Sequence, residues 1–345
     1  MDNKIPVTII TGFLGAGKTT LINELLYQPQ DEKIAVIVNE YGDVGVDHHL
    51  VVNVEEEIYQ MNNGCLCCTL RTDLSDMLQT IYSIREKQTV QIDRIIIETT
   101  GLAEPGPIAQ TFMRHPFLQE HYTIDSVITL VDAGSALYQL AHYEESKDQV
   151  AFADKLLLTK VDSVSNETLH ALKQKLRALN PFAAIDHLNL EEVAIKEVLG
   201  LELFNEQKRE KVMTEVDEEE GHDHDHGHDH EVHHHHHTDD IVTLSLKAKD
   251  PIHPTLIDMW MNELIMTYGM DLLRYKGILH LYKDPNQIVY QGVNMTFQAE
   301  RGQPWGDQEK ESVLVFIGKN LPVKEMELAF KRCVLTEEVM EELGI

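Results

Sequence analysis

The segment 12–19 of this chain combines residue types and a spacing that can bind phosphate. It has the sequence GFLGAGKT, which fits the pattern G-x-x-x-x-G-K-[ST], and it lies between an apolar run at 7–11 and a predicted helix that begins at Thr20. Glycines let the backbone curl so that its N–H groups face phosphate oxygens, while a lysine supplies a cation. We predict that Thr19 also binds Mg²⁺. The predicted nucleotide contacts are Gly12, Gly15, Ala16, Gly17, Lys18, Thr19 and Thr20.

A second feature is a carboxylate at the end of an apolar strand. The run 95–97 is followed by Glu98 and then by TTG, which ends at Gly101. In phosphate-loop enzymes this place carries the acid that reaches the Mg²⁺ shell and the glycine whose N–H senses the γ-phosphate. We therefore predict a catalytic group of Lys18, Thr19, Glu98 and Gly101. No glutamine of this second switch stands out as the group that activates water, so slow intrinsic turnover is expected.

A third feature is the sequence TKVD at 159–162, which follows another apolar run. It resembles the N-K-x-D guanine reader of GTPases. The carboxylate of Asp162 can accept two hydrogen bonds from guanine that adenine cannot donate, and a missing hydrogen bond discriminates strongly. We predict that Thr159, Lys160 and Asp162 select GTP over ATP, although Thr159 offers only a hydroxyl where Asn is commoner. A surface Lys–Asp pair is the alternative.

The cysteines indicate a metal site. Three of the four, Cys65, Cys67 and Cys68, lie within four residues, ahead of a helix that starts near Leu70. Thiolates are soft ligands that favour Zn²⁺ over Mg²⁺ or Ca²⁺, and zinc prefers four ligands, so one position stays open. Glu40 is the candidate fourth ligand, with a Mg²⁺-shell role or a surface role as its alternatives. The fourth cysteine, Cys333, is expected to pack in a helical core.

The order of these motifs suggests how nucleotide and metal could be coupled. The cysteines lie in sequence between 39–43, a predicted first switch loop, and 98–101, the second. Loops that respond to the γ-phosphate could therefore carry or orient metal ligands. In that case, nucleotide and metal would change each other's affinity by the same factor.

A histidine-rich tract is a further candidate metal site. Neutral imidazoles bind Zn²⁺, Ni²⁺, Co²⁺ and Cu²⁺, and neighbouring carboxylates raise the local cation concentration. We predict weak metal binding at several places in the tract, and a merely solvated acidic linker is the alternative. Five of its histidines alternate with Asp or Gly, and five more run from 233 to 237; the alternating ones are His222, His224, His226, His228 and His230.

Two domains and a linker must position these residues. Apolar runs at 7–11, 34–38, 95–97, 127–131 and 156–158 alternate with helical patterns, which predicts an α/β, doubly wound, mostly parallel sheet over residues 1–205. The segment 206–240 is acidic and His-rich and is expected to be a disordered linker. Residues 241–345 are expected to form a smaller α+β domain. Its predicted elements are a strand from 241, a helix through Met259, Leu264 and Met266, strands at 272–282, 287–297 and 313–317, and a helix from about Val323.

Composition excludes several classes of function. The 345 residues include 58 Asp and Glu against 29 Lys and Arg, and the net charge of -29 repels nucleic-acid backbones and anionic membranes. No apolar stretch reaches the roughly 20 residues that span a bilayer, and a cleavable leader is not apparent. Clustered cysteines indicate a reducing compartment. We expect a soluble cytoplasmic protein that does not bind nucleic acid or membranes.

The motifs together resemble a known family. GFLGAGKTT, NEYGDVGVD, NNGCLCC, ETTGLAEP and TKVD occur in this order and are followed by a His-rich stretch and an α+β C-terminal domain, as in the CobW-type P-loop GTPases. This family is related to the GTPases that help insert nickel into urease and hydrogenase, and the resemblance covers nearly the whole chain. The resemblance implies a slow GTPase that carries Zn²⁺, sometimes cobalt or another transition metal, to a client metalloprotein. It assigns phosphates to 12–19, metal to the three cysteines, switching to Glu98 and Gly101, and the base to TKVD.

The leading hypothesis is therefore a GTP-hydrolysing metallochaperone. The tract would collect Zn²⁺, the cysteines would hold it in the GTP state, and hydrolysis would release it to the client. One alternative is a non-enzymatic zinc reservoir, and another is a cobalt chaperone for corrinoid synthesis; Co²⁺ and Ni²⁺ are the other candidate ions. The sequence predicts no oligomeric state.

Overall fold

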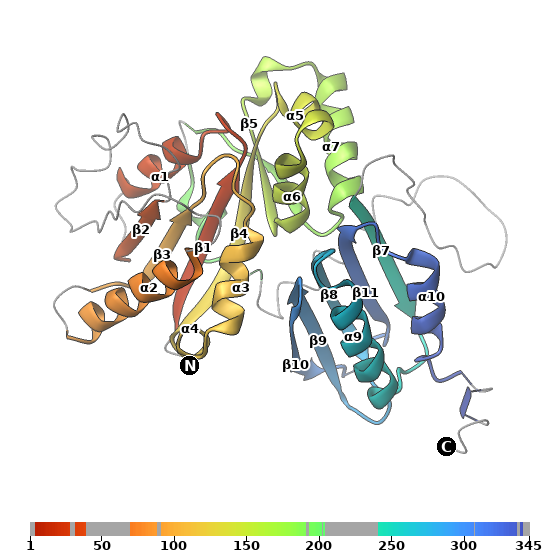
Figure 1. Ribbon diagram of the computed structural model, residues 1–345. Coiled ribbons are helices and arrows are strands. Elements are labelled where there is room, and N and C mark those ends of the chain that lie inside the picture. The colour runs from red at the N-terminus through yellow and green to blue at the C-terminus, as the bar shows by residue number, and fades with distance from the viewer. Residues whose placement is uncertain are drawn as a thin grey trace. The chain divides into compact units, whose positions relative to one another are not determined.

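The computed structural model describes residues 4–27, 32–38, 70–87, 91–190, 193–201, 203, 241–306, 308–336 and 339–340. The chain divides into two compact units, Met1–Met213 and Thr214–Ile345. Each unit has its own sheet (Figure 1).

The first unit is built on a six-stranded parallel sheet in the order β2-β3-β1-β4-β5-β6. The chain runs from β1 out to β2, returns to β3, and then crosses to β4 on the other side of β1. Such a change of direction opens a crevice at the carboxyl ends of the strands, where open α/β sheets bind ligands. The strands are β1 (Ile5–Gly12), β2 (Ile34–Val38), β3 (Arg94–Glu98), β4 (Tyr122–Asp132), β5 (Lys155–Thr159) and β6 (Ala184–His187).

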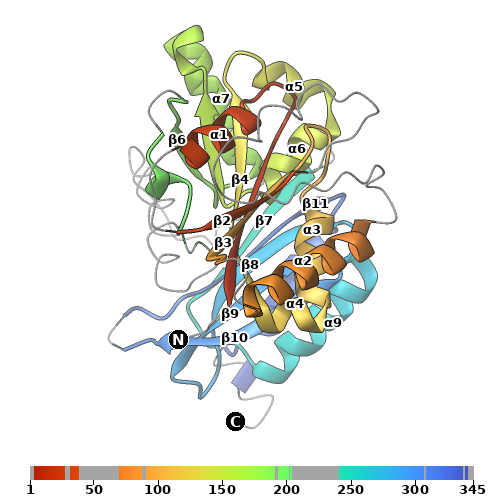
Figure 2. The same cartoon turned by 90° about the vertical axis from the view of Figure 1, so that its left-hand side faces the viewer.

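Helices lie on both faces of this sheet (Figures 1 and 2). Side chains on one face, including Ile10, Ile96 and Leu157, pack with Leu21 and Leu25 of α1 and are at most 1% exposed. Each such side chain contributes about 1.5–3 kcal/mol by leaving water. The helices are α1 (Lys18–Tyr27), α2 (Leu70–Glu86), α3 (Gly106–Arg114), α4 (Pro116–His121), α5 (Ala136–His142), α6 (Glu144–Phe152) and α7 (Asn166–Leu179), with single turns η1 (Val161–Ser163) and η2 (Ile195–Glu197).

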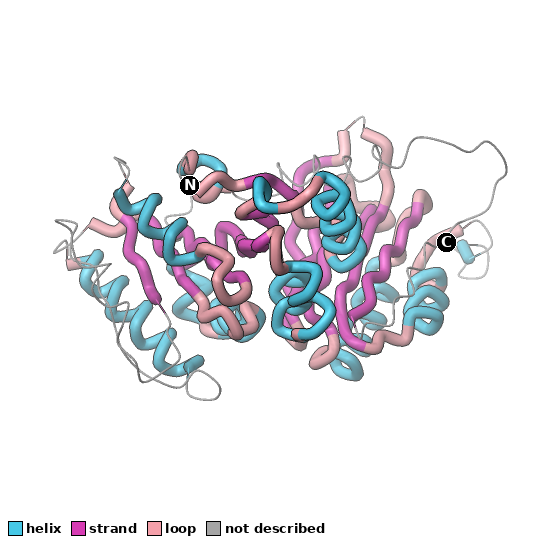
Figure 3. Tube along the Cα trace, turned by 90° about the horizontal axis from the view of Figure 1, so that it is seen from above, coloured by secondary structure: helices cyan, strands magenta, loops and turns pink. Residues whose placement is uncertain are grey.

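The second unit is a five-stranded antiparallel sheet in the order β10-β9-β8-β11-β7. Helices α9 (Pro254–Tyr268) and α10 (Val323–Lys331) cover one face of this sheet (Figures 1 and 3), where Trp260 and Phe330 pack on Phe316 and Tyr275. The elements are β7 (Ile241–Ala248), α9 (Pro254–Tyr268), β8 (Leu272–His280), β9 (Asn286–Val293), β10 (Thr296–Pro304), β11 (Ser312–Lys319) and α10 (Val323–Lys331).

The predicted fold class is confirmed, with differences in the second unit. The stretch predicted as one strand at 287–297 contains a turn: Asn294 has a φ of 48°, and β10 begins at Thr296. The helix predicted through Met259, Leu264 and Met266 is present, but only Leu264 is buried, whereas the two methionines are 64% and 76% exposed. No helix in the described ranges is both long and apolar enough to cross a membrane.

Candidate nucleotide site

The phosphate loop follows β1, and three of its glycines, Gly12, Gly15 and Gly17, have a positive φ. Gly12 has a φ of 140°, and a Cβ there would lie 2.4 Å from the carbonyl oxygen of Leu130 on the neighbouring strand β4. Gly15 has a φ of 78°, and a Cβ there would have nothing within 4 Å. Residues with a side chain rarely adopt such positive φ values, so the loop takes a path open mainly to glycine. This path brings the chain from β1 into the first turn of α1, where phosphate is expected to bind.

Lys18, the first residue of α1, lies folded against the loop. Its Nζ donates hydrogen bonds to the carbonyl oxygens of Gly12 (2.7 Å) and Phe13 (3.2 Å), and the residue is only 8% exposed. Burial lowers the pKa of Lys18, while the charge of Glu98 acts in the opposite direction. A bound phosphate would supply the anionic partner that the two carbonyls now replace.

Thr19 and Glu98 meet beside the loop. Thr19 Oγ1 donates to Glu98 Oε1 at 2.9 Å, and Glu98, the last residue of β3, is 5% exposed. The strand register Ile10↔Glu98 places this carboxylate next to the end of β1. A hydroxyl and a carboxylate oxygen are ligands that suit Mg²⁺, which usually keeps several waters and takes few protein ligands. The donor set at this place therefore fits a nucleotide-bound magnesium ion.

The segment 98–101, predicted as the second switch, lies against the phosphate loop. Gly101 is buried, and a Cβ there would come within 2.8 Å of the backbone nitrogen of Leu14. Thr99 Oγ1 lies 2.7 Å from Thr11 Oγ1, and the Thr99 N–H donates to the carbonyl oxygen of Ile10 at 3.0 Å. The structure thus brings together the residues predicted as catalytic. Lys18 and Thr19 follow the loop after β1, and Glu98 and Gly101 lie at and just after the end of the adjacent strand β3.

The predicted base reader is joined to the same loop. Thr159 is fully buried, and its Oγ1 donates to the carbonyl oxygen of Ala16 at 3.0 Å. Lys160 has a φ of 54°, and its Nζ donates to the carbonyl oxygen of Gly15 at 3.0 Å. Asp162 lies in η1 with an exposed side chain. The buried hydroxyl of Thr159 therefore holds the phosphate loop, whereas the carboxylate of Asp162 is exposed.

Sequence reasoning missed two residues that hold this arrangement. Asp132, at the end of β4, accepts from Lys160 Nζ at 2.6 Å and, through Oδ1, from the N–H of Gly134 at 2.9 Å. Gln149 of α6 donates from Nε2 to the carbonyl oxygens of Gly101 and Ala103, each at 3.1 Å. A carboxylate that ends an apolar strand drew attention to Glu98, and the same signal was present for Asp132. Nothing local distinguishes Gln149.

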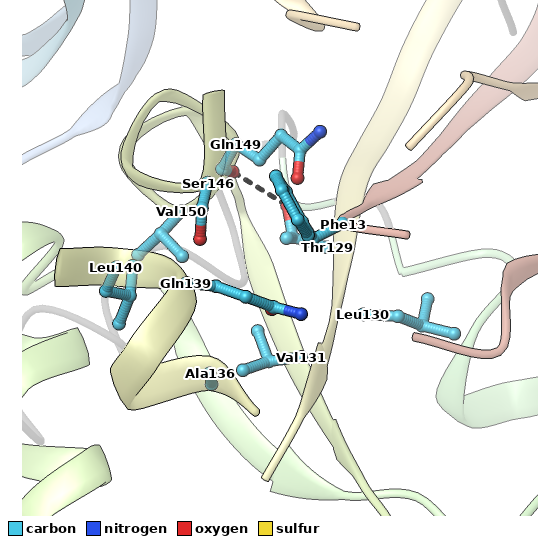
Figure 4. Close-up of a pocket in the computed structure, with 10 residues that line it drawn as sticks. All are labelled: Phe13, Thr129, Leu130, Val131, Ala136, Gln139, Leu140, Ser146, Gln149 and Val150. Carbon is cyan, nitrogen blue, oxygen red and sulfur yellow. Dashed lines mark hydrogen bonds between the residues drawn. The ribbon is translucent and has the colours of Figure 1, made fainter. Parts of the chain in front are cut away.

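A small cavity lies beside the phosphate loop (Figure 4). It has a volume of about 10 Å³, which is room for no more than one water molecule. Phe13 of the loop and Gln149 both line it, and the ring of Phe13 lies 4.9 Å from that of Tyr143. The full lining is Phe13, Thr129, Leu130, Val131, Ala136, Gln139, Leu140, Ser146, Gln149 and Val150.

The predicted metal ligands are outside the described residues. This applies to Glu40, to Cys65, Cys67 and Cys68, to His222, His224, His226, His228 and His230, and to the predicted linker. Within the described ranges, no group of three or more His, Cys, Asp or Glu residues is arranged to hold a metal ion. Cys333 is 3% exposed in the core of the second unit, just after α10, and burial raises its pKa to about 11. It therefore stays a thiol that packs in the core, as expected, but it lies in the turn after α10 and not on a helix.

These features define the class of protein. A glycine-rich loop between a buried parallel strand and a helix, beside a carboxylate that ends the adjacent strand, is the nucleotide site of the P-loop proteins.

Comparison with known proteins gives the family. Residues 6–186 match the CobW/HypB/UreG nucleotide-binding domain, and residues 241–334 match the cobalamin synthesis protein cobW C-terminal domain. The chain belongs to the CobW/HypB/UreG family of nucleotide-binding proteins, which confirms the resemblance found in the motifs.

Two relatives show how far the similarity extends. The zinc chaperone YjiA of Escherichia coli strain K12 is 37% identical over 332 residues, which cover 95% of this chain and 98% of that protein. The zinc-regulated GTPase metalloprotein activator 1 of Dictyostelium discoideum is 29% identical over 397 residues, which cover 97% of this chain and 80% of that protein. The crystal structure of Zn(II)-bound YjiA GTPase from E. coli has a TM-score of 0.74 at 30% identity and covers 96% of this chain and 100% of that one.

Proposed function

We propose that this protein is a GTP-hydrolysing metallochaperone that binds Zn²⁺ and delivers it to a client metalloprotein. The observation that carries the proposal is that the phosphate loop, the second switch and the TKVD segment are joined by side chains: Thr19 to Glu98 and Lys160 to Gly15. These links form a nucleotide cradle, and the relatives named above are a zinc chaperone and a zinc-regulated GTPase.

In this proposal, each group of the cradle has a separate task. The N–H groups of 12–20 and the ammonium of Lys18 bind the phosphates, and Asp162 accepts hydrogen bonds from guanine. Thr19 and Glu98 would hold Mg²⁺, which neutralises charge on the β- and γ-phosphates when bound. Gly101, packed on the phosphate loop, is placed to sense the γ-phosphate through its N–H. Zn²⁺ is cargo for Cys65, Cys67 and Cys68, with Glu40 as the fourth ligand and the histidine tract as the collector.

The coupling of nucleotide to metal is tested by zinc affinity in two nucleotide states. We expect the affinity of the cysteine site to differ by about 5- to 150-fold between a non-hydrolysable GTP analogue and GDP, because reciprocal coupling energies lie in that range. A chelator competition assay on a chain that lacks 222–237 isolates the cysteine site from the tract. Equal affinities in the two states would contradict the proposal and favour a reservoir, in which nucleotide has no effect.

The same chain serves to distinguish zinc from cobalt or nickel. Thiolate ligands favour Zn²⁺ over Co²⁺ and Ni²⁺, so we expect zinc to displace either ion from the cysteine site. Retention of cobalt against equimolar zinc would favour the cobalt chaperone.

Base selectivity is expected to depend on Asp162. In an Asp162→Ala protein, the KM for GTP should rise about 100-fold or more while that for ATP stays unchanged, because two hydrogen bonds to guanine are lost. Steady-state hydrolysis of both nucleotides measures this. Glu167→Gln is the matched control, since it removes a negative charge from the exposed first turn of α7. An equal rise for both nucleotides would show that Asp162 does not read the base.

A further inference from the structure

Gln149 of α6 holds the main chain of the loop that follows Glu98. Its side-chain Nε2 lies 3.1 Å from the carbonyl oxygen of Gly101 and 3.1 Å from that of Ala103, and the residue is 1% exposed. A primary amide has two N–H donors, and here each has a carbonyl acceptor. The carbonyl groups of Gly101 and Ala103 are thereby both held by one nitrogen atom, Nε2 of Gln149. A side chain of α6 therefore sets the direction of the main chain just after Gly101.

The position of Gln149 is itself fixed by the sheet. Thr129 Oγ1 on β4 donates to the main-chain oxygen of Gln149 at 2.8 Å, as the dashed line in Figure 4 shows. The residue also lines the cavity next to Phe13, so its side chain passes beside the phosphate loop on its way to the switch. Gln149 therefore links three parts: the sheet through Thr129, the phosphate-loop side of the cavity, and the switch through two carbonyls.

The loop that it holds is packed on the phosphate loop. A Cβ at Gly101 would lie 2.8 Å from the nitrogen of Leu14, which leaves no space between the two backbones. The bonds that shape the phosphate loop are separate, because Lys18 donates to Gly12 and Phe13, and Thr159 donates to Ala16. Loss of the Gln149 amide would thus release the carbonyls of Gly101 and Ala103, while Glu98 and Thr99 and the phosphate loop keep their own bonds.

We propose that Gln149 is a positioning residue for GTP hydrolysis: by binding the carbonyls of Gly101 and Ala103, it holds the second switch where the Gly101 N–H meets the γ-phosphate. The inference rests on the proposed GTPase function. It acts on the chemical step, since GDP lacks the γ-phosphate that the switch would contact. Displacement of a positioned group by about 1 Å costs on the order of 100-fold in rate.

The test compares Gln149→Met with Gln139→Met in the full chain. Methionine keeps the length and most of the volume of glutamine but donates no hydrogen bond. Gln139 lines the same cavity and bonds to Ser135 at the start of α5 at 2.9 Å, so its substitution controls for repacking. We expect Gln149→Met to lower kcat about 10- to 100-fold, with GDP affinity within about 3-fold of the original. Gln139→Met should leave both within about 2-fold.

The readouts separate failure of this inference from failure of the proposed function. If the unchanged protein hydrolyses GTP and Gln149→Met does so at the same rate, Gln149 has no positioning role. If the unchanged protein does not hydrolyse GTP, the proposed function fails, and the positioning role fails with it. Equal losses of kcat and GDP affinity would indicate a structural role and overturn the proposal. Should Gln149→Met not fold, Gln149→Leu, which also donates no hydrogen bond and adds no charge to this buried position, carries the same expectations.

Discussion

A Lys18→Ala protein is expected to hydrolyse GTP about 100- to 1000-fold more slowly than the unchanged chain, the range observed when one buried donor to a transition state is removed. Lys18 is 8% exposed and lies on the phosphate loop, with its ammonium 2.7 Å from the Gly12 carbonyl. Because Lys18 is buried, a solvent cation does not readily take its place when charge moves onto the leaving group. Single-turnover release of phosphate measures the loss.

The matched control is Lys87→Ala. Lys87 is an exposed lysine of the same unit, just after α2, so its loss changes the net charge equally without touching the loop. Its rate should stay within about 2-fold of the original, because exposed charges contribute little. A Lys18→Ala protein that keeps its full rate would remove the phosphate loop from the mechanism. If the prediction holds, the Lys18→Ala protein should also show the same zinc affinity with and without nucleotide.

A Gly12→Ala substitution should destabilise the protein by about 3 kcal/mol or more. The added Cβ would lie 2.4 Å from the carbonyl oxygen of Leu130, so the backbone of β4 must move. Alanine would also have to adopt the φ of 140° that Gly12 has, which is strained for a residue with a side chain. Overpacking costs about 1–3 kcal/mol and backbone strain of this kind about the same again. Urea denaturation of the full chain measures the change in the free energy of unfolding.

Gly15→Ala separates the two causes. Gly15 also has a positive φ, of 78°, but a Cβ there has nothing within 4 Å. It should therefore cost only the conformational penalty, about 1–2 kcal/mol. If both substitutions cost the same, the contact with Leu130 is not what makes residue 12 a glycine.

Most of the first unit could be predicted from the sequence because its four central strands, β3, β1, β4 and β5, are largely buried on both faces. Continuous apolar runs then have no competing interpretation, and five predicted runs lie within β1 to β5. The exception is β6, an edge strand whose first two residues are half-buried and whose last two are exposed, so that it lacks an apolar run.

The second unit was harder to predict because, like β6, one of its edge strands has no apolar run. β10 is an edge strand with mostly exposed side chains, among them Glu300 and Arg301, so its pairing with β9 is made by the backbone, which leaves little pattern. The exposed methionines of α9 also resemble core residues by type alone. Hydrophobicity predicts burial only when a second layer covers the side chain.

For the candidate site, the sequence indicated groups that would touch a nucleotide but missed those that hold such groups. Asp132 and Gln149 act on Lys160 and Gly101, residues 28 and 48 positions away in the chain. No local spacing rule connects such pairs. They become neighbours only because β5 lies next to β4, β4 next to β1, and β1 next to β3 in the sheet.

The bonds from Thr159 to Ala16 and from Lys160 to Gly15 tie the loop after β5 to the loop after β1. A nucleoside triphosphate that lies across both loops would be bound at its phosphate end and at its base end by two loops that are joined to each other. The nucleotide could then not dissociate by releasing one end before the other, so its residence time on the protein should be long. A partner protein that shortens this residence time would have to separate the two loops.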